Sequence, residues 1–255
     1  MTGGTHMAKN KKKTYSSKIL SVQEAVEENK NIITRAISGS NIKRLNNINW
    51  LRHEIAWNEP QILFWMPKSK QALYFDYSCT KGLGDAYDYI TSKDHNEITP
   101  SGIRDIHYLV ANETNISAGV YRQNPKILEI TVNGARVHAP DYTLVGQLVE
   151  NAIYEWKKSS KPSPLRAFDL HYNLIMIQPF EDYNKRTSRM VMNWALIQCG
   201  YRPIVFNRKT DKENYCKALS SMANGDSKTY YKYMYNAMLA SQNNIIKQLR
   251  TSKIR

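Results

Sequence analysis

Apolar residues recur every three or four positions along most of this chain, the spacing that gathers them on one face of an α-helix. In the first such segment Val22, Val26 and Ile33 share a face, and Gly39 follows as a stop signal. The same spacing predicts further helices over residues 42–57, 84–90, 101–109, 143–156, 164–177 and 187–199, and two more within 212–249.

One segment has a different period. Residues 127–132 alternate apolar and polar side chains, Asn133-Gly134 is a strong two-residue turn signal, and residues 135–139 continue as a return strand. These features predict one β-hairpin in a mainly α protein. Residues 61–77 are ambiguous, because their two short apolar runs fit either short strands or packed irregular chain.

Length and charge refine this organisation. The 255 residues are 42% hydrophobic, which is enough for one substantial core, and the net charge is +14. Lysines and arginines cluster at both ends, as in solvated, disordered tails. We expect residues 1–20 to be a disordered basic extension (1–7 resembling a remnant of an expression tag), followed by a helical region at 21–79, a main domain at 80–240 and a basic tail at 241–255.

The cysteines and the charge bear on location and partners. Cys79, Cys199 and Cys216 are too far apart for a metal motif and leave an odd thiol, which favours a reducing compartment. We expect a cytoplasmic protein, with a secreted effector as the alternative. No apolar run reaches the roughly 18 residues of a membrane span, so we expect no membrane partner. The basic balance indicates an anionic partner, and nucleic acid ranks last because charge alone supports it.

The most informative segment is a polar loop at residues 178–189. It follows an apolar run at 174–177 and leads into a second run at 190–197. A loop that feeds the start of a helix is a natural anion site, because the first helical amides lack internal partners and the helix dipole adds positive potential. The loop includes the carboxylate of Asp182, the amide of Asn184 and three cations, Lys185, Arg186 and Arg189.

This loop resembles the signature of the Fic family, His-Pro-Phe-x-Asp-Gly-Asn-Gly-Arg-x-x-Arg. The segments at 118–122, 170–172 and 200–203 also look like family sequence, so the resemblance covers roughly residues 80–240. It implies a Fic-like helical domain with the β-hairpin as a flap ahead of the signature helices. Within the signature, the matching residues are Pro179, Phe180, Asp182, Asn184, Arg186 and Arg189.

The resemblance implies a protein adenylyltransferase, which moves AMP from ATP to a hydroxyl of a target protein. By that reading Asp182 holds Mg²⁺, although it could instead cap a turn or pair with Arg186. The flap would dock an extended target segment, although its apolar residues also fit ordinary packing. The nucleotide phosphates would be bound by Asn184, Lys185, Arg186 and Arg189, and the target by Ile130, Thr131 and Val132.

Three positions depart from the signature. Gln178 stands where the family has its general base His, and an amide cannot take a proton near neutral pH. Tyr183 replaces a Gly, so either the loop backbone differs or the Tyr ring fills part of the nucleotide site. Lys185 replaces another Gly and gives a sequence similar to the Doc branch, where a phosphoryl group is thought to move. His171 lies about 10 Å from Gln178 along a helix and is better interpreted as a packed residue than as a substitute base.

Three functions therefore remain open. The chain could be a degenerate adenylyltransferase with weak or altered transfer, a catalytically inactive module that binds and regulates a protein partner, or a Doc-like phosphotransferase. Whether it is an enzyme at all depends on Gln178. The inhibitory motif of many Fic proteins, Ser/Thr-x-x-x-Glu-Gly/Asn, is not recognisable in the sequence.

Overall fold

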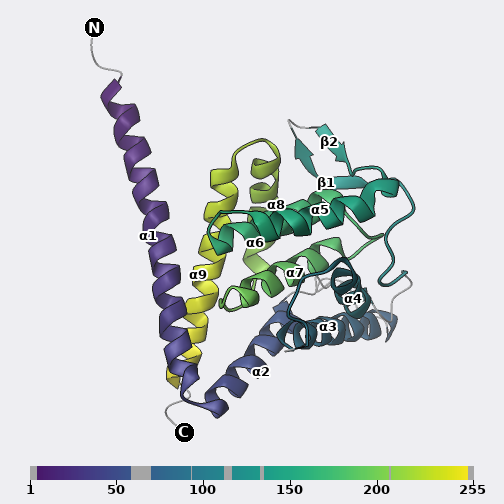
Figure 1. Ribbon diagram of the computed structural model, residues 1–255, viewed down its shortest axis with the longest axis horizontal. Helices are drawn as coiled ribbons and strands as arrows, with labels where there is room; N and C mark the ends of the chain where they lie inside the picture. Colours follow the sequence, from purple (N-terminus) through teal and green to yellow (C-terminus); the bar gives the residue numbers. More distant parts are fainter. Residues whose placement is uncertain are drawn as a thin grey trace.

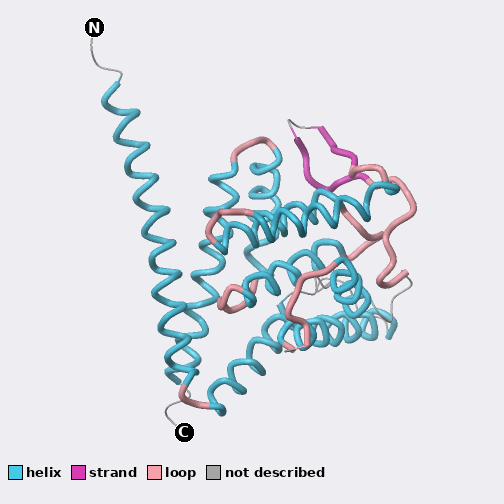
Figure 2. Tube along the Cα trace, in the orientation of Figure 1, coloured by secondary structure: helices cyan, strands magenta, loops and turns pink. Residues whose placement is uncertain are grey.

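The computed structural model describes residues 5–58, 70–92, 94–111, 117–132, 135–206 and 208–251. This part of the chain forms nine α-helices, one 3-10 turn and one two-stranded sheet (Figures 1 and 2). The mainly α fold with one hairpin is confirmed. In chain order the elements are α1 (Thr5–Ser38), α2 (Asn41–Asn58), α3 (Lys70–Thr91), α4 (Pro100–Ala111), β1 (Ile127–Val132), β2 (Ala135–His138), η1 (Tyr142–Leu144), α5 (Val145–Lys158), α6 (Ser163–Ile177), α7 (Asn184–Gln198), α8 (Arg208–Ala223) and α9 (Ser227–Thr251).

Helices α6 and α7 pair at the centre of the fold. Helix α5 covers α6, while α3 and α4 pack against α7. Every residue of α7 from Met190 to Leu196 is buried, as expected of a helix that other elements surround on all sides. The loop between α6 and α7 is therefore anchored at both ends in helices that pack at the centre of the fold.

Hydrogen bonds define the start of helix α4 and the register of the β-hairpin. The Thr99 Oγ1 accepts from the backbone N–H of Gly102 at 3.0 Å and so caps the start of α4. The hairpin also matches its prediction, with Ile127 opposite His138 and Val132 opposite Ala135. The turn residues 133–134 lie outside the described part of the chain.

Near both ends of the chain, the residues that the structure describes are helical. Helix α1 starts at Thr5, and residues 5–38 contain neither Gly nor Pro to interrupt it. Helix α9 continues to Thr251 and packs against α1, burying Ile245, Ile246 and Leu249. The first turns of α1 extend beyond the rest of the fold (Figure 1).

Two further expectations concern the region before α4. The structure places residues 70–77 in helix α3 rather than in a strand, while 59–69 are outside the described residues. Within the described helices, none has both the length and the apolar character needed to cross a membrane.

Candidate functional site

The signature loop joins the end of α6 to the start of α7 through two left-handed residues. Gln178 has φ 48° and caps α6, where its backbone N–H donates to the carbonyl of Leu174 at 3.1 Å. Tyr183 has φ 59° just before Asn184. Left-handed backbone costs a non-glycine residue about 1–2 kcal/mol, so packing must hold both residues in place. The loop thus has at Tyr183 the backbone shape that Gly would adopt without cost.

The side chain of Asn184 closes the loop. Its Oδ1 accepts from the backbone N–H of Phe180 at 2.9 Å, and its Nδ2 donates to the Phe180 carbonyl at 2.8 Å. Asn184 is buried, and Phe180 is fully buried, as expected of a core anchor. The amide therefore shapes the loop, while a contact between Asn184 and nucleotide stays a prediction.

His107 of α4 packs against the loop and bonds its backbone, a role that was not predicted from the sequence. Its ring stacks on Phe180, with centroids 3.8 Å apart and planes 1° from parallel. Its Nδ1 accepts from the Gly119 N–H at 2.9 Å, so Nε2 carries the proton and donates to the Asp182 carbonyl at 3.1 Å. Burial lowers the pKa of His107 to about 4, which keeps the ring neutral.

Arg122 is the second supporting residue, and the sequence marked it only as part of a family-like segment. Its backbone N–H donates to the carbonyl of Pro179 at 2.9 Å, and its side chain is buried. The guanidinium ties the end of α6 to both sides of the hairpin by donating to the backbone carbonyls of Gln178 (2.8 Å), Ile177 (3.4 Å), Asn124 (2.8 Å) and Pro140. The hairpin and the loop are therefore held as one unit.

The predicted phosphate-binding cations lie in the first two turns of α7. Arg186 and Lys185 are half-buried, and the Arg186 guanidinium lies 4.6 Å from the centre of the Tyr183 ring. Asp182 is exposed, and its Oδ1 accepts from the Tyr183 N–H at 2.6 Å. The carboxylate thus bonds the turn backbone, while a contact between Asp182 and Mg²⁺ stays a prediction.

A buried network lies behind the loop. The guanidinium of Arg189 lies 5.6 Å from the ring centre of Tyr215 and 5.8 Å from that of Phe206. The Tyr230 hydroxyl donates its hydrogen to a backbone carbonyl of α6, so toward His171 it can only accept. His171 Nδ1 therefore carries the proton and donates to Tyr230 at 2.9 Å, and His171 Nε2 accepts from the Tyr215 hydroxyl at 2.8 Å. Burial, followed by the charge of Arg189, lowers the pKa of His171 to about 3. His171 is a packed residue, as interpreted from the sequence.

Gln178 occupies the position of the family's base. Its side chain is 8% exposed, and Nε2 donates to the Ile175 carbonyl at 2.8 Å. The amide is thus bonded back onto α6. The predicted docking residues Ile130, Thr131 and Val132 lie on β1, and their side chains are outside the described part of the structure.

Comparisons with known proteins agree with this fold and loop. Residues 97–196 match the model of the Fic/DOC family. A protein adenylyltransferase Fic of Nematostella vectensis is 30% identical over 161 residues, which are 60% of this chain and 36% of that protein. The protein adenylyltransferase fic-1 of Caenorhabditis elegans is 28% identical over 169 residues, covering 64% and 32% respectively. The chain spans about a third of the length of these relatives.

Solved structures show the same fold. A Fic-domain-containing signaling protein from Bacteroides thetaiotaomicron superposes with a TM-score of 0.73 at 21% identity, covering 89% of this chain and 97% of that one. Fic-1 of C. elegans gives 0.71 at 19% identity, covering 98% and 80%. A Fic domain from Bartonella quintana with bound ADP gives 0.52 at 17% identity, covering 74% and 94%. The chain therefore contains a Fic/DOC family domain, over residues 97–196, and both the hairpin and the signature loop lie within it.

Proposed function

We propose that this protein binds ATP at the start of α7 and transfers AMP slowly to a hydroxyl of a target protein. The observation that carries the proposal is the loop itself, which is fixed by Asn184, His107 and Arg122 and places Lys185 and Arg186 half-exposed at a helix N-terminus. Cations at such an end attract phosphate by their charge, and the helix dipole adds positive potential there. The names of the relatives support AMP as the transferred group.

The proposed reaction is a direct transfer that needs no covalent enzyme intermediate. An oxygen of the target hydroxyl attacks the α-phosphorus of ATP, the bond to the leaving pyrophosphate breaks, and the hydroxyl proton leaves to water or to a phosphate oxygen. Arg186 would stabilise the charge on the phosphate oxygens during this step. The exposed Asp182 carboxylate fits Mg²⁺, which usually takes one or two carboxylates together with substrate phosphates and would neutralise their charge.

Gln178 sets the expected rate. Because its Nε2 donates to the Ile175 carbonyl, Oε1 is the atom that can accept a hydrogen bond from a target hydroxyl. The amide can orient that hydroxyl but cannot remove its proton. General-base catalysis typically contributes about 10²–10⁴-fold, so transfer should be slower than in a site with His by about that factor.

The hairpin is the surface on which we propose that the target docks. A strand such as β1 can pair with an extended segment through backbone hydrogen bonds, and Arg122 couples the hairpin to the loop. A hydroxyl on such a segment would be held at a fixed position relative to Gln178.

The test follows a labelled phosphate. The protein is incubated with ATP labelled at the α or the γ position, Mg²⁺ and cell extract, alongside Arg186→Ala, Gln178→His and the control Arg35→Ala, an exposed position on α1. We expect slow transfer of the α label, loss in Arg186→Ala, a gain of up to about 10²–10⁴-fold in Gln178→His, and no change in the control.

Other results would change the proposal. Transfer of the γ label would instead support a Doc-like phosphotransferase. ATP binding without transfer, in both the original chain and folded Gln178→His, would leave an inactive binding module. That outcome is favoured by one observation, the inward hydrogen bond of the Gln178 amide.

A further inference from the structure

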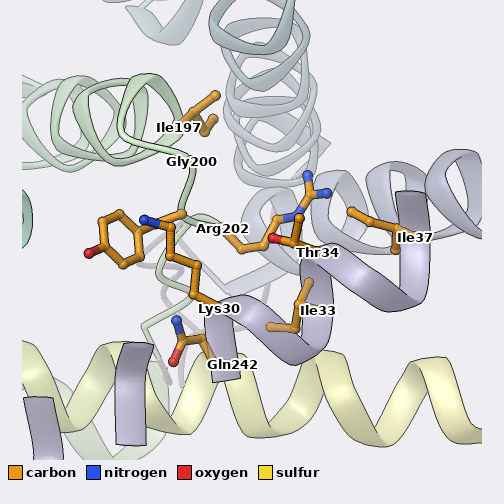
Figure 3. A pocket seen from close by; sticks show the side chains of 9 residues that line it. Lys30, Ile33, Thr34, Ile37, Ile197, Gly200, Arg202 and Gln242 are labelled. Atoms are coloured by element: carbon orange, nitrogen blue, oxygen red, sulfur yellow. The ribbon is translucent and has the colours of Figure 1, made fainter. Parts of the chain in front are cut away.

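A second polar pocket lies between α1, the segment that follows α7, and α9, and it shares no residue with the signature loop (Figure 3). Its volume is about 240 Å³. Polar side chains from three separate parts of the chain meet here, over apolar walls. The lining includes Lys30, Ile33, Thr34, Ile197, Arg202 and Gln242.

Gln242 is the first sign that the pocket holds a ligand. The residue is 1% exposed, and neither Nε2 nor Oε1 has a hydrogen-bond partner in the described part of the chain. Figure 3 shows its amide beside Lys30 in the pocket. Folded proteins rarely leave a buried amide without partners, because water is lost without a compensating bond. A molecule inside the pocket would supply the missing partners.

Arg202 is the second sign. Its guanidinium is half-buried, and the groups that act on its charge are the Tyr87 phenol and the Arg44 guanidinium. Burial raises the pKa of Tyr87 well above its usual range, so that phenol is neutral and offers no negative charge. Burial and the like charge of Arg44 both disfavour the Arg202 cation. An anion in the pocket would offset both effects.

Lys30 adds a second cation on the other side of the opening. Its Nζ lies 3.9 Å from the centre of the Tyr201 ring and 3.9 Å from a carboxylate oxygen of Glu27, one helical turn earlier. Glu27 also accepts from the Tyr201 hydroxyl, so its carboxylate is shared. The long ion pair leaves Lys30 able to contact a further acceptor.

We propose that this pocket binds a small oxyanion, with a phosphate or carboxylate group between Lys30 and Arg202 and a hydrogen bond from Gln242 Nε2. The volume equals that of about eight water molecules and is below the roughly 300–1,000 Å³ of pockets for drug-sized ligands, so the occupant is a small metabolite. The walls of Ile33 and Ile197 suit a short aliphatic body. Such an anion would join α1 to the end of α7.

The test measures the thermal unfolding of the full chain in sodium phosphate and, separately, in sodium succinate, against sodium chloride at equal ionic strength. We expect at least one of the two oxyanions to raise the melting temperature in a saturable way. Arg202→Gln should weaken that anion's affinity by about tenfold or more, because a charge-assisted hydrogen bond is lost. Gln242→Leu should also weaken it while remaining folded, since it removes two unpartnered polar atoms.

Two controls separate this pocket from the signature loop. Arg35→Gln removes one positive charge from an exposed position of α1, and the anion should still raise the melting temperature of this variant. Arg186→Ala removes a cation from the signature loop, and the anion should raise the melting temperature of this variant as well. A shift that survives Arg202→Gln and Gln242→Leu but disappears in Arg186→Ala would place the anion at the loop and overturn the proposal.

Two remaining results are also decisive. Absence of any shift with either anion would mean that ordered water alone fills the pocket, which overturns the proposal. If Arg202→Gln fails to fold, Lys30→Gln replaces it, and an unchanged anion affinity in that variant would contradict the proposed site.

Discussion

Acid should destabilise this fold through two buried histidines, His107 and His171. Both are fully buried, and burial lowers their pKa values from 6.5 to about 4 and about 3. Between these values and pH 6.5 the unfolded chain binds protons that the folded chain does not, so stability falls as the pH falls. One pH unit is worth about 1.4 kcal/mol per proton. At pH 5 the two histidines together should therefore remove about 4 kcal/mol from a total of about 5–15 kcal/mol.

Urea unfolding between pH 5 and pH 7 measures this loss. His171→Gln and His107→Gln should each flatten the pH dependence of the unfolding free energy by about 1.4 kcal/mol per pH unit. The slope is the informative quantity, because either substitution also changes stability at neutral pH. His53→Gln, at an exposed position of α2, reports how much an exposed imidazole contributes to the slope. A slope in both buried variants equal to that of the original chain would refute the reasoning.

Three further predictions are checked by urea unfolding at neutral pH. Arg122→Met should lose about 3 kcal/mol or more, because four backbone carbonyls lose their donor, and a loss below about 1 kcal/mol would contradict this. Gly82→Ala should lower the unfolding free energy by about 2 kcal/mol, since its Cβ would lie 2.3 Å from a carbonyl oxygen of α4. Gly146→Ala has open space around its Cβ and should raise the unfolding free energy by up to about 1 kcal/mol. Equal effects of the two substitutions would refute this. Asn184→Ala should lose about 2 kcal/mol and weaken ATP binding measured by calorimetry, and unchanged values would contradict its role in the loop.

Much of the fold followed from local patterns in the sequence. The helical periods located α4 to α7 closely, and Asn133-Gly134 located the hairpin, because these signals depend on neighbouring residues alone. The ends of the chain carry two opposing signals. Clustered lysines in residues 1–20 favour a disordered tail, whereas the same stretch from Thr5 onward has no residue that breaks a helix.

The site was predictable in part for the same reason. The loop, its cations and its carboxylate are contiguous in sequence, so they could be recognised together. His107 and Arg122 could not, because they act on backbone carbonyls 75 and 56 residues away. Every residue has the same backbone carbonyl, so no local sequence pattern predicts which side chain will bond to a given one. The available signals were a His on the apolar face of α4 and, for Arg122, the family-like segment at 118–122.

The way the loop is supported also makes it a template for protein engineering. Arg122, His107 and Asn184 all bond backbone atoms of the loop, and Arg122 and His107 lie outside it, so much of its shape is set by side chains from other elements. The Glu181 side chain is exposed and can be varied while these bonds remain. A library of variants at such positions would sample new chemistry on a fixed frame, with folding and catalysis encoded by separate residues.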